Sequence, residues 1–363
     1  DNNNHIFTSE AQAHGTHVAG TIAAVNNNGL GVNGIAGGSG KGDGVRIMCL
    51  QSIGQGENGG SGSGIASAVR AVKYAADNGA VICQNSWGYD QQLSWNTWTR
   101  SSFSALRRAM DYFIKYAGVD ENGNQTGPMK GGILIFASGN QGVSWQSYPA
   151  ADDMVVAVSA SAYNGDAAVY TNYGPWVDIT APGGDLYLDS DYGGVYSTVP
   201  GKDGVSSYAY MNGTSMACPH VSGACALAVS YYWGENHRKG LTPDKLREAL
   251  LSSAAPINAN LSPAYSGQMG AGQLDTYRLL CYMDYMDGIP AMELSVGQMK
   301  ELSLEGLFPQ TGALSWSLTD SGVVSVSVED NVMNIKALAP GSCVLKLSDG
   351  AYFYKTMDIT VSR

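Results

Sequence analysis

The sequence predicts an α/β protein with a doubly wound, mostly parallel sheet, followed by a small all-β sandwich. From residue 14 to about 280, apolar strand-like runs alternate with helical stretches, a pattern typical of a parallel sheet covered by helices on both faces. After about residue 285, short alternating runs between Gly, Asp and Pro turns indicate β-structure. We therefore expect one domain over residues 1–285 and a second over residues 290–363.

Hydrophobic periodicity and capping residues define the elements of the first domain. Helices are expected over residues 17–25, 63–79, 101–118, 215–233 and 242–254. Strands are expected over residues 45–53, 80–88, 131–140 and 153–161. The last helix has Thr242 as its N-cap and Pro243 at its first position, where the missing N–H of proline costs nothing.

Composition excludes several classes of protein. The net charge of -11 argues against binding to nucleic acid phosphates, which requires a basic surface. No apolar run approaches the roughly 18 residues of a transmembrane helix. The six cysteines form no CxxC pair, and most lie in apolar runs, which predicts buried free thiols and neither a disulfide framework nor a zinc site.

Two motifs carry the residues of a nucleophilic site. AHGTHVAGTIAA places His14 at the start of a helix, and NGTSMACPHVSGACAL places Ser215 at the start of another. A serine hydroxyl becomes a good nucleophile when a base such as imidazole takes its proton. The backbone N–H at the start of a helix can donate to an oxyanion, and so can the side chain of Asn140, which follows a strand in FASGNQG. These residue types predict acyl transfer.

HGTHVAGT, SGNQG and GTSMACPHVSG resemble the subtilisin-like serine proteases, the subtilases, nearly letter for letter. The resemblance extends from residue 14 to about 280 and includes SYPAADDMVVAVSA and YGPWVDITAPG. It implies a serine endopeptidase that hydrolyses peptide bonds through an acyl-enzyme on Ser215. His14 would be the general base and Asn140 the oxyanion donor, and no cofactor would be required for this chemistry.

The same resemblance implies where the substrate would lie. The peptide would form an extended strand that pairs with backbone on both sides. The residues expected to contact it are Gly60, Ser61, Gly62, Ser86, Trp87, Gly88, Ala137, Ser138, Gly139 and Ser147. Their small, uncharged side chains favour an apolar or aromatic residue before the cut. Trp95 and Trp98 follow in an insertion and could form extra subsites or pack as a loop cover.

The loop VNNNGLGV resembles a calcium loop of the family and implies a structural Ca²⁺. The expected ligands are the side chain of Asn27 and the backbone carbonyls of Val25, Leu30 and Val32. Family members complete this site from N-terminal segments that this sequence does not contain. A later loop, residues 183–210, carries several aspartates, and calcium binding, attraction of basic substrates and a solvated loop all fit them.

Subtilases orient the histidine with an aspartate at the end of the first sheet strand, well upstream. No such block precedes His14, and Asp1 has no strand behind it. We therefore expect the triad Asp to lie outside this chain, and a central strand with it, which would leave an open slot in the sheet. The protein could be nicked, with its own cleaved N-terminal segment as partner, or truncated, or a pseudoprotease. Loss of the acid typically costs around 10⁴ in kcat.

The resemblance thus implies a secreted or cell-surface bacterial protease that acts on peptide or protein substrates. WSLTDSGVVSVSV and IKALAPGSCVLKL resemble bacterial immunoglobulin-like domains, so an Ig-like sandwich is expected over residues 290–363. Two alternatives remain, of which only the second uses the same catalytic residues. One is a catalytically silent subtilase-fold protein that binds surfaces, and the other is an esterase-type hydrolase.

Overall fold

The computed structural model describes residues 13–52, 64–100, 103–201, 206–234, 237–257, 261–285, 289–305, 307, 314–348 and 354–363. The chain forms two compact units, Asp1–Thr276 and Tyr277–Arg363. The boundary between the units falls at the start of helix α7 (Thr276–Tyr285), about ten residues before the join that the sequence predicts at residues 286–290. Part of that join, residues 286–288, lies outside the described residues.

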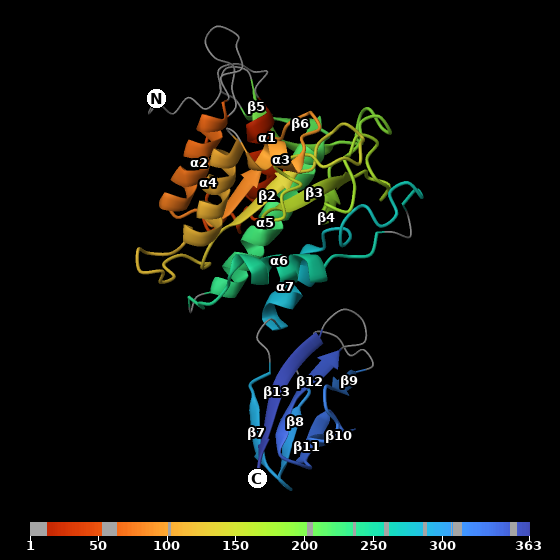
Figure 1. Ribbon diagram of the computed structural model, residues 1–363. Coiled ribbons are helices and arrows are strands. Elements are labelled where there is room, and N and C mark those ends of the chain that lie inside the picture. The colour runs from red at the N-terminus through yellow and green to blue at the C-terminus, as the bar shows by residue number, and fades with distance from the viewer. Residues whose placement is uncertain are drawn as a thin grey trace. The chain divides into compact units, whose positions relative to one another are not determined.

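The first unit contains a parallel sheet with the strand order β1-β2-β3-β4 (Figure 1). Its strands are β1 (Ile82–Asn85), β2 (Ile133–Ala137), β3 (Val156–Ser161) and β4 (Ile179–Pro182). Every residue of β2 and β3 is buried, which explains why both read as continuous apolar or small-residue runs. Because the strands are parallel, the carboxyl ends of β1 and β2 lie at one edge of the sheet, with Asn85 opposite Phe136.

Helices cover both faces of this sheet, as the sequence predicts. Helices α2 (Ile65–Asp77) and α4 (Phe103–Tyr116) lie side by side in Figure 1, and their core includes Leu134 and Phe136 of β2. Side chains alternate along a strand, so Ile135 faces the opposite side. The central helix α5 (Thr214–Trp233) packs against β1, β2, β3 and β4. The doubly wound α/β class is therefore confirmed.

The remaining elements of the first unit surround α5. Helix α1 (His14–Ala23) packs against α5 and against the antiparallel pair of β5 (Val195–Pro200) and β6 (Ser206–Met211). The short helix α3 (Trp95–Thr99) lies against α4. Helix α6 (Pro243–Ser252) begins as predicted, since Thr242 Oγ1 accepts a hydrogen bond from the Lys245 N–H at 3.4 Å.

The strand predicted over residues 45–53 is wrong for its described part. Residues 45–52 form no regular structure, and β1 has a strand neighbour only on its β2 side among the described residues. An apolar run becomes a strand only when a neighbouring edge accepts its backbone hydrogen bonds. The exposed side chains of this segment consequently include three apolar ones and one thiol that was expected to be buried: Val45, Ile47, Met48 and Cys49.

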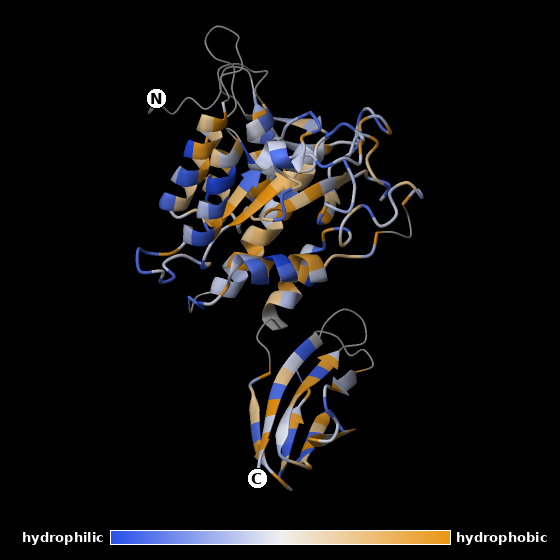
Figure 2. Cartoon of the chain, in the orientation of Figure 1, coloured by the Kyte–Doolittle hydropathy of each residue, from blue (hydrophilic) through white to orange (hydrophobic). Residues whose placement is uncertain are grey.

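The second unit is built from β-strands after α7. One sheet has the order β10-β11-β8 and the other β7-β13-β12-β9. The strands are β7 (Met292–Ser295), β8 (Met299–Ser303), β9 (Ser315–Leu318), β10 (Val324–Glu329), β11 (Val332–Ala337), β12 (Gly341–Ser348) and β13 (Tyr354–Ser362). Figure 2 shows hydrophobic and hydrophilic residues alternating along β12 and β13. Their buried side chains share one core with those of the other sheet, and these include Val324, Ile335, Leu345 and Ile359.

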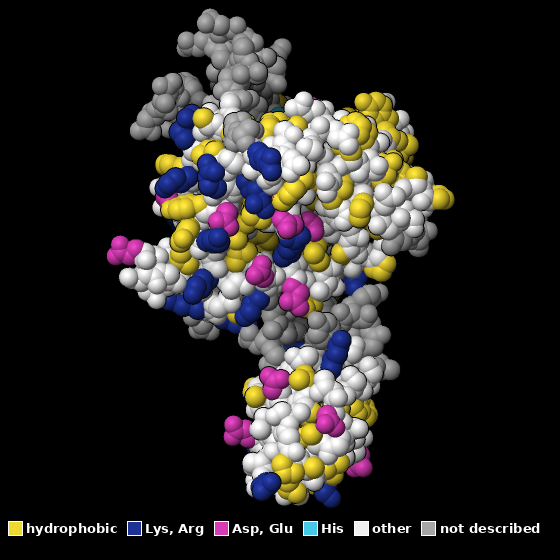
Figure 3. Space-filling model, in the orientation of Figure 1, with side chains coloured by type: hydrophobic (Ala, Val, Ile, Leu, Met, Phe, Trp, Pro, Cys, Tyr) yellow, Lys and Arg dark blue, Asp and Glu magenta, His cyan; other side chains and the backbone are white. Residues whose placement is uncertain are grey.

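The surface carries charges of both signs. Figure 3 shows Lys and Arg interspersed with Asp and Glu on one face of the first unit, and no continuous basic patch on that face. No helix in the described part of the chain has the length and apolar character that crossing a membrane requires. All six thiols are free. Three of them are fully buried: Cys218, Cys225 and Cys343.

Candidate active site

Ser215 is the second residue of α5, after the N-cap Gly213. Pro219 follows four residues later and has no N–H, so the Ser215 carbonyl has no helical partner. The hydroxyl of Ser86, just beyond β1, instead donates to that carbonyl at 2.7 Å. The Ser215 Oγ in turn donates to the Ser86 carbonyl at 3.3 Å. These two bonds fix the start of α5 against the carboxyl end of β1.

Asn140 lies three residues beyond the end of β2, and its amide is oriented by Thr214. The Asn140 Oδ1 accepts from the Thr214 N–H at 2.9 Å and from the Thr214 hydroxyl at 2.8 Å, which leaves Nδ2 as the free donor of the amide. A Cβ built on Gly213 would lie 3.4 Å from Asn140 Nδ2 and 3.6 Å from the Ser215 backbone nitrogen. Two N–H donors therefore border one space, which stays open because residue 213 is glycine.

His14 is the first residue of α1, and α1 packs against α5, the helix that carries Ser215. The side chain reaches solvent, but the surrounding protein desolvates the imidazole and lowers its pKa below the ordinary value. Among the described residues, no hydrogen bond joins His14 to Ser215. The structure thus places the two candidates on packed helices without linking them directly.

Two further histidines support α1 and α5. The buried His17 shares its Nε2 between the carbonyls of Val195 at 3.0 Å and Ala209 at 3.2 Å, which ties α1 to the β5–β6 pair. His220 Nδ1 lies 2.8 Å from the Met216 carbonyl one turn earlier in α5. Burial lowers the pKa of both imidazoles, so both remain neutral structural groups near pH 7.

A cavity of about 210 Å³ opens beside Ser215, between the ends of β1 and β2. Of the residues predicted to contact substrate, the lining includes Ser86, Trp87, Gly88, Ala137, Ser138, Gly139 and Ser147. Asn140 and Thr214 complete the wall nearest the nucleophile. The remaining predicted contacts, Gly60, Ser61 and Gly62, lie outside the described residues.

Three further residues that line this cavity were not predicted: Asp90, Gln141 and Tyr148. Each follows a predicted residue within two positions, so adjacency to the motifs is the sequence signal that points to them. Asn172 lies under the cavity and was also missed. It is fully buried, and its Nδ2 donates to the Ser138 carbonyl at 3.1 Å and to the Ser147 hydroxyl at 2.9 Å. No local signal marks Asn172, because it contacts these residues only through the fold.

The two tryptophans of the insertion have different environments. Trp98 is fully buried and stacks on Tyr148, with ring centroids 5.2 Å apart and an interplanar angle of 16°. Its Nε1 donates to Asp152 at 2.6 Å. Trp95 is 46% exposed and lies 6.2 Å from the Tyr148 ring. Trp98 therefore packs behind the cavity wall, whereas Trp95 remains accessible to solvent.

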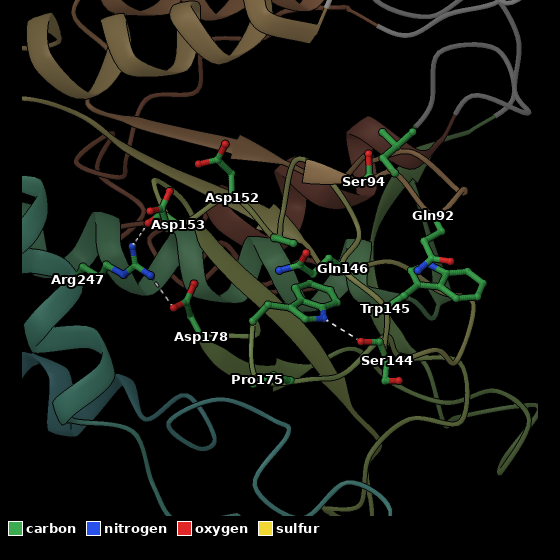
Figure 4. A pocket seen from close by; sticks show the side chains of 13 residues that line it. Gln92, Ser94, Ser144, Trp145, Gln146, Asp152, Asp153, Pro175, Asp178 and Arg247 are labelled. Atoms are coloured by element: carbon green, nitrogen blue, oxygen red, sulfur yellow. Dashed lines mark hydrogen bonds and ion pairs between the residues drawn. The ribbon is translucent and has the colours of Figure 1, made fainter. Parts of the chain in front are cut away.

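A larger groove of about 720 Å³ lies near the end of α6 (Figure 4). Figure 4 shows Arg247 reaching toward Asp178 and Asp153, and its nitrogens bond the Asp178 carboxylate at 2.6 Å and the Asp153 carbonyl at 2.7 Å. Asp152 accepts from Arg107 Nε at 2.8 Å. Burial alone would raise the pKa of Asp152, but its hydrogen bonds outweigh burial and lower it. These charges are already paired, so the smaller cavity beside Ser215 is the better candidate for a substrate site.

The expected calcium loop follows α1. Val25 and Leu30 are exposed, and Asn27 adopts a left-handed backbone with φ of 59°. The neighbouring Asn26 has a buried Oδ1 without a hydrogen-bond partner. An inward oxygen without a donor suits a cation, although it belongs to residue 26 and not to the predicted ligand. No cluster of three or more acidic, His or Cys side chains that could hold a metal occurs in the described part of the chain.

Part of the loop expected over residues 183–210 instead forms the strands β5 and β6, and the aspartates stand in the turns before β5. Asp185 is fully buried and accepts from the backbone N–H groups of Val169 at 2.8 Å and Tyr187 at 2.9 Å. A solvated role is therefore wrong for Asp185. Asp189 accepts hydrogen bonds from the backbone N–H groups of residues that follow it, including that of Asp191 at 2.9 Å.

Comparison with known proteins agrees with this architecture. Residues 1–272 match the Subtilase family. The chain is 31% identical to the thermophilic serine proteinase of Bacillus sp. (strain AK1) over 264 residues, which is 73% of this chain and 52% of that protein. It is 35% identical to subtilisin Savinase of Lederbergia lenta over 221 residues, 61% of this chain and 64% of that protein.

A protease structure from Pseudoalteromonas arctica superposes with a TM-score of 0.54 at 28% identity, covering 74% of this chain and 70% of that one. Because the family match spans most of the sequence, the chain belongs to the subtilase family of serine proteases. It spans 52% and 64% of the length of the two curated relatives named above.

Proposed function

We propose that this protein is a subtilisin-type serine endopeptidase with Ser215 as nucleophile and His14 as general base. The Ser215 oxygen attacks the carbonyl carbon of the scissile peptide bond, and its proton passes to His14. The resulting oxyanion accepts hydrogen bonds from Asn140 Nδ2 and the Ser215 backbone N–H. The C–N bond then breaks as His14 protonates the leaving amine, and water hydrolyses the acyl-enzyme.

The observation that carries this proposal is the open space at Gly213. Asn140 Nδ2 and the Ser215 nitrogen both border it, within 3.4 and 3.6 Å of a Cβ built there. It lies beside the nucleophile and at the edge of the cavity. A binding protein has no need for two N–H donors near one open space next to a serine hydroxyl, whereas acyl transfer requires such donors.

The Ser215 hydroxyl points toward the Ser86 carbonyl and not toward His14. This observation favours the second candidate, a catalytically silent surface-binding protein. A hydroxyl rotor turns readily, and catalytic hydrogen bonds often tighten only when substrate binds. We therefore keep the peptidase as the proposal and test it directly.

The test is covalent labelling of the complete protein with a fluorophosphonate probe. We expect one adduct that disappears in Ser215→Ala and persists in Ser230→Ala, which removes an exposed serine of the same helix. Peptide hydrolysis should survive deletion of residues 290–363. No Ser215-dependent adduct would refute the peptidase and favour the silent alternative.

We also propose that the acid that orients His14 comes from outside the described residues, either upstream or on a second cleaved chain. Two observations support this. Desolvation is the cause of the His14 pKa shift, with no carboxylate among its causes. The edge of β1 away from β2 has no strand partner among the described residues, so it could accept the strand that carries the acid.

Intact mass and N-terminal sequencing of the active protein test the source of the acid. We expect a longer N-terminus or a second chain that remains bound. Subtilisin-like turnover by a protein with the mass of this chain alone would contradict the proposal.

We further propose that the protein acts on peptides or proteins and that a bacterial cell secretes it. We also propose that a structural Ca²⁺ binds the loop that contains Val25, Asn27, Leu30 and Val32. The names of the relatives support the first two proposals, and the inward Oδ1 of Asn26 supports the third. Lengthening a peptide p-nitroanilide on its acyl side should raise kcat/KM, because an extended substrate strand gains backbone contacts that a small-ester pocket does not offer. Chelation with EDTA should lower the Tm, and added Ca²⁺ should restore it.

A further inference from the structure

One carboxylate lines the cavity beside Ser215. Asp90 is exposed, and its Oδ1 accepts a hydrogen bond from Gln141 Nε2 at 2.8 Å. The other lining residues that the structure describes include no Lys, Arg or His. A neutral amide therefore holds the negative charge of Asp90 at the open rim of the cavity, and no cation neutralises it there.

The orientation of Gln141 is set from the interior. Asn172 Nδ2 donates to Gln141 Oε1 at 2.9 Å, so only the amide N–H groups of Gln141 remain to face Asp90. Asn172 is fixed in turn, because its Oδ1 accepts from the backbone N–H groups of Gln141 at 2.9 Å and Val143 at 3.3 Å. A chain of hydrogen bonds thus runs from the buried Asn172 through Gln141 to Asp90.

Among the described lining residues, the inner part of the cavity carries no carboxylate. Ser138 Oγ donates to the Asn172 carbonyl at 3.1 Å, and Ser147 Oγ accepts from Asn172 Nδ2 at 2.9 Å, so both inner hydroxyls are already engaged. The walls include two partly exposed aromatic residues, Trp87 and Tyr89, and the buried Tyr148. Long basic side chains lay their aliphatic stems on such walls and keep the charged head in water. At this rim, the head would lie beside Asp90.

On the basis of the proposed peptidase function, we propose that Asp90, positioned by Gln141 and Asn172, makes the cavity select Lys or Arg immediately before the scissile bond. This selectivity departs from the apolar or aromatic preference that the predicted linings alone suggest. The attraction between opposite charges supplies it, and the exposure of Asp90 makes it sensitive to salt.

The test compares peptide p-nitroanilides that differ only in the residue before the cut: lysine, norleucine or glutamate. Norleucine has the stem of lysine without its charge, so the ratio of the two kcat/KM values isolates the charge. We expect the lysine-to-norleucine ratio to fall about fivefold in Asp90→Asn, as befits a solvent-exposed charge pair. The glutamate-to-norleucine ratio should rise.

Glu121→Gln is the matched control, because it removes the same charge from an exposed residue that does not line the cavity. It should leave both ratios unchanged. Gln141→Met should lower the lysine ratio while Asp90 is intact, because it removes the amide that positions the carboxylate. Equal lysine ratios in the wild type and Asp90→Asn would overturn the proposal, as would a wild type that cleaves after glutamate as readily as after lysine.

Binding separates this inference from the peptidase proposal. In Ser215→Ala, which cannot turn over, calorimetry with tetrapeptide amides ending in lysine or norleucine should show the same preference for lysine. That preference should shrink in Ser215→Ala with Asp90→Asn. Selective binding without any turnover in the wild type would refute only the peptidase. Turnover without a charge preference would refute only the role of Asp90.

Discussion

Thr214 orients Asn140. The Asn140 Oδ1 accepts both the backbone N–H and the hydroxyl of Thr214, at 2.9 and 2.8 Å, while Thr214 Oγ1 accepts from the Gly139 N–H at 3.1 Å. The residue before the nucleophile thus fixes which side of the Asn140 amide faces Gly213. The orientation of the Asn140 amide, the proposed oxyanion donor, therefore depends on the start of α5 as much as on the turn that follows β2.

Asn140→Ala should lower kcat by about 10²–10³-fold with a much smaller change in KM. The magnitude is the one that follows loss of this donor in subtilisin itself. The reason is that Nδ2 would bond the oxyanion and not the ground-state carbonyl. Steady-state kinetics on a peptide p-nitroanilide would measure it. An equal loss in kcat and 1/KM would point to a binding role for Asn140.

Thr214→Val keeps the shape of the side chain but removes the hydroxyl donor to Asn140. We expect kcat to fall about three- to tenfold, the equivalent of one hydrogen bond. The backbone N–H of residue 214 still orients the amide, so the loss should be smaller than in Asn140→Ala. Combining both substitutions should cost no more than Asn140→Ala alone. An additive double variant would show that Thr214 acts independently of Asn140.

For this chain without the proposed orienting acid, the acid limb of the pH profile should lie below the ordinary histidine pKa. His14 acts as a base only when neutral, and desolvation lowers its pKa from 6.5. With a lowered pKa, the imidazole stays neutral to lower pH, so kcat/KM should be retained below pH 6.5 and be lost only as His14 becomes protonated. A profile of kcat/KM against pH measures the midpoint. A midpoint above 6.5 would show a carboxylate stabilising the imidazolium.

Trp98→Phe should destabilise the protein by about 1–3 kcal/mol, because it leaves the buried Asp152 without one of its hydrogen-bond donors. Trp95→Phe is the matched control, since Trp95 is 46% exposed, and it should change the stability by less than about 0.5 kcal/mol. Urea denaturation of both variants gives the comparison. Equal effects would mean that the Asp152 contact contributes little.

The local features of this protein could be predicted from its sequence, because the residues that define them are neighbours in the chain. The cap at Thr242 and the long apolar helix after Ser215 are examples. The strand expected over residues 45–53 could not be judged in the same way. Its apolar pattern is correct for a strand, but a strand also needs a partner edge, and the local sequence does not show whether one is present.

The candidate site also contains residues that local motifs predict and residues whose role depends on the fold. His14, Asn140 and Ser215 stand in motifs whose chemistry can be read residue by residue. Asp90 stands only two residues beyond the predicted Gly88, yet its role depends on Gln141 from another strand end. The sequence suggests an uncharged cavity, because the residue that charges it comes into place only when the ends of β1 and β2 meet.

The buried Asn172 has a consequence for how this protein can change. The Asn172 side chain holds the turn that carries Asn140, and it also holds the Gln141 amide that positions Asp90. The proposed oxyanion donor and the proposed selectivity residue therefore share the support of Asn172. A substitution that retunes preference at Gln141 will disturb the catalytic turn, whereas Asp90, at the outer end of the chain of bonds, can vary with the least effect on rate. Natural or laboratory evolution of new specificities should begin at that outer position.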